Sequence, residues 1–217
     1  MTLRITIASS ADSWIHPYVD QLETSLKTAG HEVRRVTSAA ELTEGDLCFL
    51  LGCGFLVSSE RLALHRHNLV VHESALPEGR GWSPMTWQVL EGKSEIPITL
   101  FEAAEAVDAG PIYLQDTMRF SGHELVEDLR AIQGSSTVDL CERFVAEFPG
   151  IVERARPQEG EASVYARRGP EDSRLDPEVS LRDQFNLLRV VDNERYPAFF
   201  ELEGRRYVLQ ITRDEEA

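Results

Sequence analysis

Cysteine is scarce in this chain, and the few cysteines have no metal-binding spacing. Cys48, Cys53 and Cys141 form an odd set without a C-x-x-C pair. This pattern gives no sign of a disulfide framework or of a zinc site. We interpret the three as reduced thiols in the core of a cytoplasmic protein, and we expect no bound metal.

Long apolar runs are also missing. No segment approaches the roughly 20 apolar residues that a membrane span requires. The first residues, MTLRITIASS, read as a strand and a turn rather than as a charged stub followed by a long apolar run. We therefore expect neither a signal peptide nor a membrane partner.

Basic residues are few relative to acidic ones. The 217 residues include 22 Lys and Arg against 37 Asp and Glu, which gives a net charge of −15. Binding along a phosphate backbone needs clustered basic residues, so we expect no nucleic-acid partner. The same acidity is also compatible with a role in solubility alone or with a salt-rich habitat.

A G-x-G-x-x-G fingerprint is absent after the first expected strand, so a dinucleotide site of that kind is not expected. Apolar periodicity predicts strands at 3–8, 31–36 and 46–51, and helices at 14–29 and 59–66. Strands that alternate with helices form parallel sheets with right-handed crossovers. The predicted fold is α/β, a doubly wound, mostly parallel Rossmann-like sheet.

The stretch 68–112 carries the candidate chemistry. It predicts a buried strand at 69–71, a Pro- and Gly-rich loop at 76–84, a helix from Pro84 to Gly92 and a strand at 96–101. His72 follows the first strand, and Asp108 precedes a Gly-Pro turn. An imidazole and a carboxylate can perform acid–base chemistry if they meet, although a lone histidine is more often a hydrogen-bonded neighbour.

Three motifs follow one another in this part of the chain: His72-x-Ser74-x-Leu76-Pro77, Arg80-Gly81 and Asp108-x-Gly110-Pro111-Ile112. With them the chain resembles the folate-dependent formyltransferases, most closely over residues 45–120. The resemblance implies N10-formyltetrahydrofolate as co-substrate and a catalytic domain over 1–155. It implies that His72 is the acid–base or oxyanion group, with Asp108 as its carboxylate partner.

The resemblance also implies the binding residues. The pterin ring of the folate is expected against the loop 54–57 and the turn before Gly110, whereas the simpler interpretation of 52–57 is a turn into the next helix. Acceptor contacts are expected from Ser74, Arg80 and Trp82. The expected folate-binding residues are Gly54, Phe55, Leu56, Val57, Val107 and Asp108.

One position departs from the family pattern Asn-x-His-x-Ser, because Val70 stands where the family has Asn. That amide normally donates to the developing oxyanion, and loss of one such donor typically costs about 2.7–4 kcal/mol. Asn68 would share a face with His72 but lie about 6–7 Å too far along the strand. Even so, the sequence VVHESxLPxGRGWSP resembles the motif of the subgroup that acts on 4-amino sugars of the pseudaminic acid pathway.

The remaining chain predicts a strand at 113–120, a long helix from about 121 to 147 that bends near Gly134, and a linker or arm at 156–177. A helix from Ser180, a hairpin at 198–211 and a solvated tail at 213–217 follow. The YPAFF segment resembles the nucleotide-binding part of sugar N-formyltransferases. The implied substrate contacts are Arg189, Asn193, Tyr196 and Phe199, with Arg195 as a second arginine.

We therefore interpret residues 156–217 as an appendage that contributes to sugar-nucleotide binding. In the opposing interpretation the aromatic residues form the hairpin core and the arginines lie in water. Short apolar hairpins often pair, so a homodimer is favoured.

The predicted function is formyl transfer from N10-formyltetrahydrofolate to the amine of a UDP- or dTDP-linked 4-amino sugar, in carbohydrate biosynthesis. Three alternatives stay open. One is a folate- or nucleotide-binding relative that has lost catalysis through Val70, and the second is transfer to another small amine such as glycinamide ribonucleotide. The third is an α/β domain in which the motif match is accidental.

Overall fold

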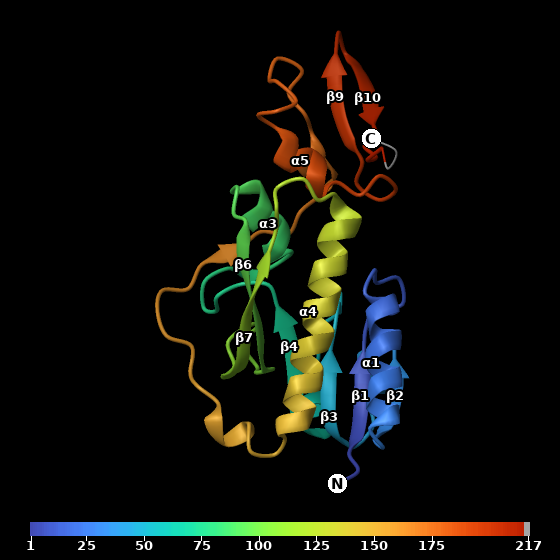
Figure 1. Ribbon diagram of the computed structural model, residues 1–217, viewed down its shortest axis with the longest axis vertical. Coiled ribbons are helices and arrows are strands. Elements are labelled where there is room, and N and C mark those ends of the chain that lie inside the picture. Colours follow the sequence, from blue (N-terminus) through green and yellow to red (C-terminus); the bar gives the residue numbers. More distant parts are fainter. Residues whose placement is uncertain (215–217) are drawn as a thin grey trace.

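A six-stranded sheet forms the centre of the computed structural model, which describes residues 1–214 (Figure 1). The end of the predicted tail, residues 215–217, lies outside the described residues. The strands are β1 (Arg4–Ala8), β2 (Glu32–Val36), β3 (Gly45–Leu50), β4 (His65–His72), β5 (Arg80–Gly81), β6 (Glu95–Glu102), β7 (Ile112–Arg119), β8 (Val164–Tyr165), β9 (Ala198–Leu202) and β10 (Arg205–Leu209). The helices are α1 (His16–Thr28), α2 (Ser59–Leu62), α3 (Pro84–Leu90), α4 (Val126–Glu147) and α5 (Phe185–Val190), with 3-10 turns η1 (Ala39–Glu41), η2 (Val152–Arg154) and η3 (Pro170–Ser173).

The strand order of the large sheet is β2-β1-β3-β4-β6-β7. The pairs β1–β2, β1–β3 and β3–β4 are parallel, whereas β4–β6 and β6–β7 are antiparallel. Within this sheet β6 alone therefore runs against the other strands. The predicted mostly parallel, Rossmann-like sheet is confirmed.

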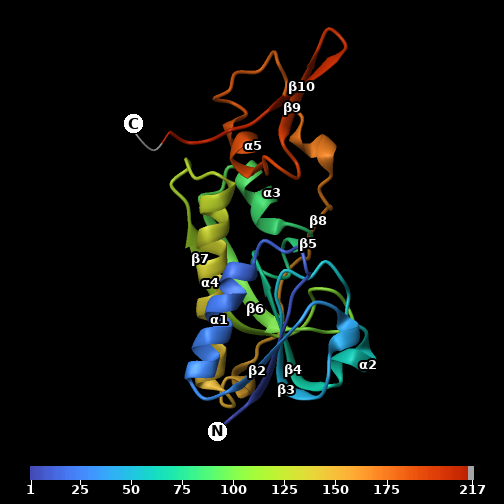
Figure 2. The ribbon, with the colours of Figure 1, turned by 90° about the vertical axis from the view of Figure 1, so that its right-hand side faces the viewer.

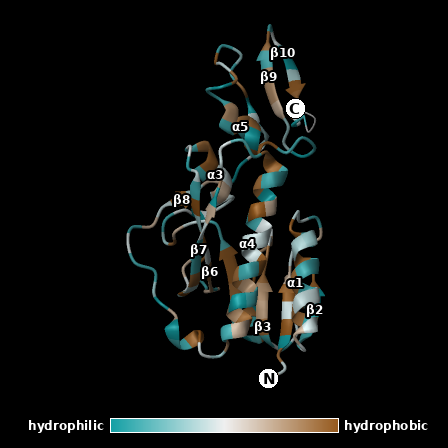
Figure 3. Cartoon of the chain, viewed as in Figure 1, coloured by the Kyte–Doolittle hydropathy of each residue, from teal (hydrophilic) through white to brown (hydrophobic). Residues whose placement is uncertain are grey.

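Two apolar clusters cover the two faces of the sheet. On β3, Leu47 and Phe49 pack beneath α1 and α4, while Cys48 and Leu50 pack on the opposite face near η1 and α2. Figure 2 shows α1 and α4 together on one side and α2 on the other. The strands β1 and β3 carry hydrophobic colours along most of their length in Figure 3, as a strand buried on both faces requires. No helix among residues 1–214 is long and apolar enough to cross a membrane.

The predicted helices agree only in part with the observed ones. The helix expected at 59–66 ends at Leu62, because pairing with β3 draws His65 and the residues after it into β4. The side chain of Asn68 then donates to the carbonyl oxygen of Leu62. The helix α4 runs without interruption through Gly134, where a Cβ would overlap the ring of Tyr18. Gly134 therefore serves close packing between α1 and α4.

A small C-terminal module, residues 174–213, lies against α3 and the first turn of α4 (Figure 1). Its hairpin β9–β10 turns at Glu203-Gly204, as predicted. The helix expected from Ser180 begins only at Phe185, and Leu181, which precedes it, is 62% exposed. The apolar centre of the module contains Leu175, Leu188, Val191 and Ala198.

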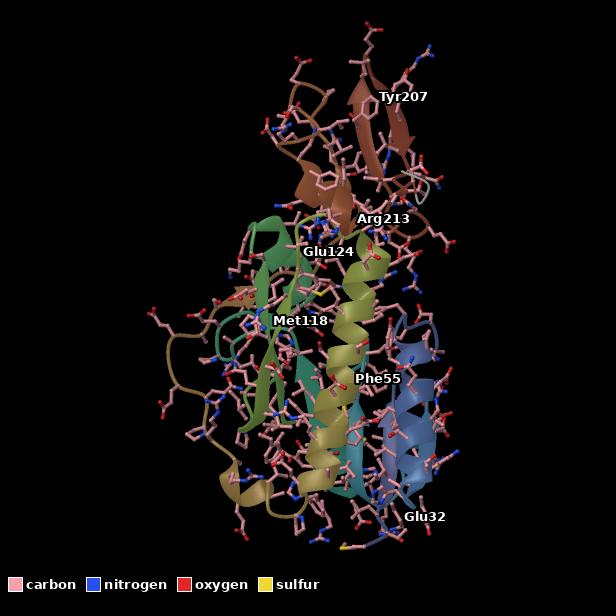
Figure 4. The ribbon with its side chains drawn as sticks, viewed as in Figure 1. Glu32, Phe55, Met118, Glu124, Tyr207 and Arg213 are labelled. Carbon is pink, nitrogen blue, oxygen red and sulfur yellow. The ribbon has the colours of Figure 1, made fainter. Side chains whose placement is uncertain are left out.

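A buried ion pair joins this module to the sheet domain. Arg189 and Glu124 are 2.9 Å apart, with side chains 5% and 10% exposed. The helix α4 begins at Val126, later than expected, so Glu124 lies just before it. The Glu124 carboxylate accepts the backbone N–H of Ser121, as the predicted capping box requires, and also that of Gly122. Burial by itself would raise the pKa of Glu124, but these donors lower it to about 2 from an ordinary 4.5. Figure 4 labels Glu124 and Arg213 at this junction.

Candidate functional site

The carboxyl end of β4 carries the predicted histidine. Alternate residues of a strand point to opposite faces. On β4, Leu69 and Val71 pack into the cluster beneath α1 and α4, whereas Val70 packs with Phe101 on the other face. His72 shares the face of Val70. The imidazole therefore lies on the side of the sheet that the two long helices do not cover.

The loop after β4 orients this imidazole. His72 is 7% exposed, and its Nε2 lies 2.8 Å from the carbonyl oxygen of Gly79. A carbonyl oxygen only accepts hydrogen bonds, so Nε2 carries a proton and donates it. A neutral His72 is therefore the Nε2–H tautomer, with Nδ1 as the unprotonated nitrogen.

Asp108 reaches the same place from the loop between β6 and β7. Its Oδ2 lies 4.0 Å from Nε2 of His72 and accepts the backbone N–H of Gly81 at 2.9 Å. The two side chains are only 8% and 11% exposed. A separation of 4.0 Å is too long for a hydrogen bond, but it makes an ion pair whenever the imidazole is protonated. Two side chains 36 residues apart in sequence are thus brought together.

The backbone at position 81 accepts only glycine without strain. Its φ is +99°, and a Cβ there would overlap the backbone oxygen of Tyr165, on the paired strand β8. Side chains rarely adopt this φ, and the close approach leaves no space for one. The absence of a side chain at Gly81 lets β5 pair with β8 while its N–H holds Asp108.

Gln158 is a residue of this site that sequence analysis missed. Its Nε2 donates to the backbone oxygens of Asp108 and Gly110, each at 2.9 Å. Its Oε1 accepts from Arg80 at 2.6 Å. A single glutamine in a segment predicted to be a linker carries no local signal of such contacts, which depend on the tertiary fold.

Glu73 was also missed, although it directly follows His72. Its carboxylate accepts from Gln133 on α4 at 2.6 Å, on the opposite side of the strand from the imidazole. Desolvation raises the pKa of Glu73, while the neighbouring His72 lowers it. The acid next to the histidine in sequence is therefore held by α4, and the acid that approaches Nε2 is Asp108.

The two loops expected to hold the folate lie side by side. Phe55 (labelled in Figure 4), Val57 and Ala103, which begins the Asp108 loop, all pack against the apolar cluster that contains Cys48 and Leu50. Leu56 is 77% exposed and Val107 is 56% exposed. Such exposed apolar side chains beside buried polar ones suit a flat, largely apolar ring system. Gly54 donates its backbone N–H to Ser10 Oγ at 2.7 Å, which fixes the turn of the first loop.

The predicted acceptor contacts occupy different surroundings. Ser74 is 2% exposed, and no partner of its Oγ is found among the described residues. It lines a cavity of about 520 Å³ together with Gly79 and Tyr165; neither His72 nor Asp108 is part of that lining. Trp82 is 41% exposed, and the guanidinium of Arg167 lies 4.7 Å from its ring centre.

The position of the family asparagine is apolar here. Val70 is half-buried and packs against two apolar clusters, one containing Cys48 and Leu50 and the other containing Phe101. Asn68 does not replace the missing amide, because its Nδ2 donates to Leu62 and its backbone oxygen accepts from Ala103. The donor for a developing oxyanion therefore does not come from β4 side chains at these two positions.

The predicted nucleotide contacts in the C-terminal module are mostly engaged within the chain. Arg189 is 4% exposed and donates to Glu124, and Phe199 is fully buried. Both groups of the Asn193 side chain bond the backbone of Ile211. Tyr196, 45% exposed, keeps an accessible ring. Arg195 pairs instead with Asp12, in the loop after β1.

The thiols lie apart from this chemistry. Burial raises the pKa values of Cys48 and Cys53 to about 12, which keeps both protonated near neutral pH. Cys141 is fully buried in the core. Among residues 1–214, no three His, Cys, Asp or Glu side chains gather closely enough to hold a metal ion.

Comparison with known proteins gives a family match that includes His72 and Asp108. A family model described as Formyl transferase matches residues 11–133. A methionyl-tRNA formyltransferase of Cutibacterium acnes is 28% identical over 200 residues, which are 89% of this chain. The chain spans about 60% of the length of that relative.

Solved structures share the fold. A methionyl-tRNA formyltransferase from Clostridium thermocellum has a TM-score of 0.80 at 20% identity, covering 99% of this chain and 94% of that one. HypX from Aquifex aeolicus in complex with tetrahydrofolic acid has a TM-score of 0.77 at 20% identity, covering 97% and 38%. A 4-N formyltransferase from Francisella tularensis has a TM-score of 0.73 at 15% identity and covers 98% of each chain.

Proposed function

This chain belongs to the formyl transferase family, and we propose that it moves a formyl group from N10-formyltetrahydrofolate to the amine of a nucleotide-linked amino sugar. The observation that carries the proposal is the ion-pair distance of 4.0 Å between His72 Nε2 and Asp108 Oδ2. Both residues fall inside the matched part of the chain, and both are shielded from water.

His72 transfers the protons of the reaction, and Asp108 stabilises its charged form. When bound, the folate supplies the formyl group and the nitrogen that must leave with a proton. His72 takes a proton from the attacking amine and returns one to the leaving nitrogen, as histidine commonly does in general acid–base catalysis. Asp108 stabilises the ring while it is charged, and the bond from Gly81 keeps the carboxylate in place.

The residues at the site fit a folate. The exposed Leu56 and Val107 offer apolar surface on two adjoining loops, with half-buried Phe55 and Val57 beside them. Covering that surface with a heterocycle would remove apolar area from water, which is favourable at about 25 cal/mol per Å². HypX, which has the same fold, is known in complex with tetrahydrofolic acid, and this supports the assignment of the co-substrate.

A nucleotide-linked amino sugar is the acceptor that we favour. The Francisella 4-N formyltransferase matches this chain over 98% of both lengths, including the C-terminal module. The net charge of −15 disfavours a polyanionic acceptor. Arg80 and Trp82 flank Gly81, which bonds Asp108, and they offer a cation and an aromatic ring for contacts with the nucleotide sugar.

The test is formyl transfer by the purified chain to a panel of UDP- and dTDP-linked 4-amino sugars, with N10-formyltetrahydrofolate supplied. The product is identified by mass as an acceptor that has gained one carbonyl unit. We expect turnover with at least one sugar, and a loss of at least about 100-fold in His72→Ala, since one acid–base group typically contributes 10²–10⁴-fold. No turnover with any sugar, with folate binding intact, would refute the proposal and favour a binding protein.

Methionyl-tRNA is a second candidate acceptor. It is supported by the Cutibacterium relative and by the Clostridium structure. The same assay distinguishes it when aminoacylated initiator tRNA and glycinamide ribonucleotide are included as acceptors. Turnover with the tRNA alone would replace the sugar proposal while leaving the formyl-transfer chemistry intact.

A further inference from the structure

The loop between β6 and β7, residues 103–111, holds its carboxylate in a conformation that costs energy. Asp108 has a φ of +54°, in the left-handed region that side chains other than glycine rarely adopt. Such a backbone typically costs about 1–3 kcal/mol and persists only when its surroundings hold it. Backbone hydrogen bonds join the loop ends to the sheet, from Ala103 N to Asn68 O and from Glu102 N to Pro111 O.

The side chain of Gln158 holds the part of the loop that carries the carboxylate. Its two N–H groups reach the backbone oxygens on either side of Ala109, those of Asp108 and Gly110, both at 2.9 Å. Its oxygen accepts from Arg80 at 2.6 Å. Both ends of the amide are used, and their chemistry fixes its orientation, because carbonyls only accept and a guanidinium only donates.

The segment around Gln158 is fastened on both sides of it. Arg156 exchanges two backbone hydrogen bonds with Ile112, at 2.8 and 2.9 Å. Further along, Ser163 accepts the Gly79 N–H through its Oγ and the Arg80 N–H through its carbonyl oxygen. Residues 156–163, which we call the strap, therefore contact both the Asp108 loop and the loop that follows His72. The Gln158 amide lies between these two attachments.

We propose that Gln158 is a positioning residue for formyl transfer, which holds the Asp108 carboxylate at His72 and couples that loop to Arg80. This rests on the proposed function. The residue touches neither reactant, since its contacts are the backbone oxygens of the loop and the Arg80 guanidinium. It acts by keeping the carboxylate at the 4.0 Å separation from the imidazole.

Two substitutions distinguish the role of the donor NH₂ group of Gln158 from that of its acceptor oxygen. Gln158→Ala removes all three bonds. Gln158→Glu keeps an acceptor for Arg80, but it replaces the donor with an oxygen that repels the two carbonyls. If the donor half positions Asp108, the two variants lose activity alike, by about 10- to 100-fold in kcat, the range seen when a supporting contact lets a reacting group shift by about 1 Å.

The experiment measures two quantities in the wild type, Gln158→Ala, Gln158→Glu and the control Glu159→Ala. Glu159 is the next residue of the strap, and it is exposed. The first quantity is amide hydrogen exchange in peptides covering residues 103–111, which needs no acceptor. The second is kcat and KM for formyl transfer with whichever acceptor the wild type uses.

We expect at least tenfold faster exchange in residues 103–111 for both Gln158 variants, no change in β1 and β3, and a fall in kcat that exceeds any change in KM. Glu159→Ala should match the wild type in both measurements. Unchanged exchange in the loop, or a kcat of Gln158→Glu within about twofold of the wild type, would overturn this inference. A wild type that formylates no acceptor would instead overturn the proposed function, while the exchange data would still decide whether Gln158 holds the loop.

Discussion

Asp108→Asn removes one negative charge from the site and changes little else. Asparagine has the same shape and keeps an oxygen that can accept the Gly81 N–H, now at 2.9 Å. The charge matters only while His72 is a cation, that is, after the imidazole has taken a proton. The variant should therefore bind its reactants normally and fail during the chemical step.

The size of the effect follows from the distance. Two unit charges 4.0 Å apart attract by about 4 kcal/mol at an effective dielectric constant near 20. Each 1.36 kcal/mol corresponds to about tenfold in rate, so complete loss approaches about 1,000-fold in kcat. Residual exposure of 8% and 11% lets water screen part of the attraction. We therefore expect a fall of about 100- to 1,000-fold.

The assay is steady-state formyl transfer, with KM for the folate measured separately. Asp116→Asn is a matched control, because Asp116, on the strand β7, forms an exposed ion pair with Arg143 of α4. It should retain wild-type kcat. If Asp108→Asn keeps kcat within tenfold of the wild type and its melting temperature is unchanged, the carboxylate does not stabilise a charged imidazole and the assigned role is wrong.

Three further changes test other parts of the structure. Gly81→Ala should destabilise the chain by about 1–3 kcal/mol or more, because its φ of +99° is unfavourable for alanine and the new Cβ meets Tyr165; an unchanged denaturation midpoint would contradict this. Val70→Asn should raise kcat by up to about 100-fold by restoring an oxyanion donor, while burial of the amide costs about 1–3 kcal/mol of stability; unaltered kcat in a folded variant would show that another group already donates. Glu124→Gln should cost about 3–5 kcal/mol in urea unfolding near pH 7, because Arg189 is left buried without its counter-charge. The pKa of Glu124 falls from 4.5 to about 2 on folding, so the ionised carboxylate contributes its full share of the free energy of unfolding above about pH 4.5 and loses it as the pH drops towards 2. The prediction is wrong if the wild type and Glu124→Gln lose the same stability over this pH range.

The elements of the sheet could be predicted from periodicity because local pattern and tertiary contact agree there. The strands expected at 3–8 and 46–51 correspond to β1 and β3, and the helix expected to end near 147 ends at Glu147. Each is an apolar stripe or run with matching flanks. The same logic failed at 59–66, where pairing of β4 with β3 overrode a short helical pattern.

Proximity of His72 and Asp108 was predictable only through the motif. No periodicity predicts that a loop at the far end of β6 returns over the sheet to reach the histidine. The contacts that hold it there, from Gly81 and Gln158, come from segments 27 and 50 residues away in sequence. Such long-range contacts leave no local signal, so the sequence around Gln158 predicts only a linker.

Arg189 shows how a correct motif can lead to an uncertain role. The YPAFF segment leads into β9, and the resemblance implies that the arginine before it contacts the substrate. In the structure that arginine is 4% exposed and bonds Glu124 and Asn186. A sequence gives the presence of a cation but not its partner, and here the partner lies 65 residues away.

The charges of the C-terminal module lead to a last prediction about the acceptor. Five arginines of the module pair with carboxylates outside it, so these cations do not form an unpaired basic surface. A polyanion that neutralised many cations would show a steep fall in affinity with salt, whereas a nucleotide sugar makes only a few phosphate contacts. We expect KM for the nucleotide sugar to rise less than about tenfold between 50 and 200 mM salt, against a loss of about 10³-fold or more for a ligand with many phosphate contacts. A steep salt dependence of KM would mean that the module opens these pairs to bind a polyanion, and it would favour tRNA as acceptor. The pairs are Arg174–Glu171, Arg189–Glu124, Arg195–Asp12, Arg206–Glu171 and Arg213–Asp128.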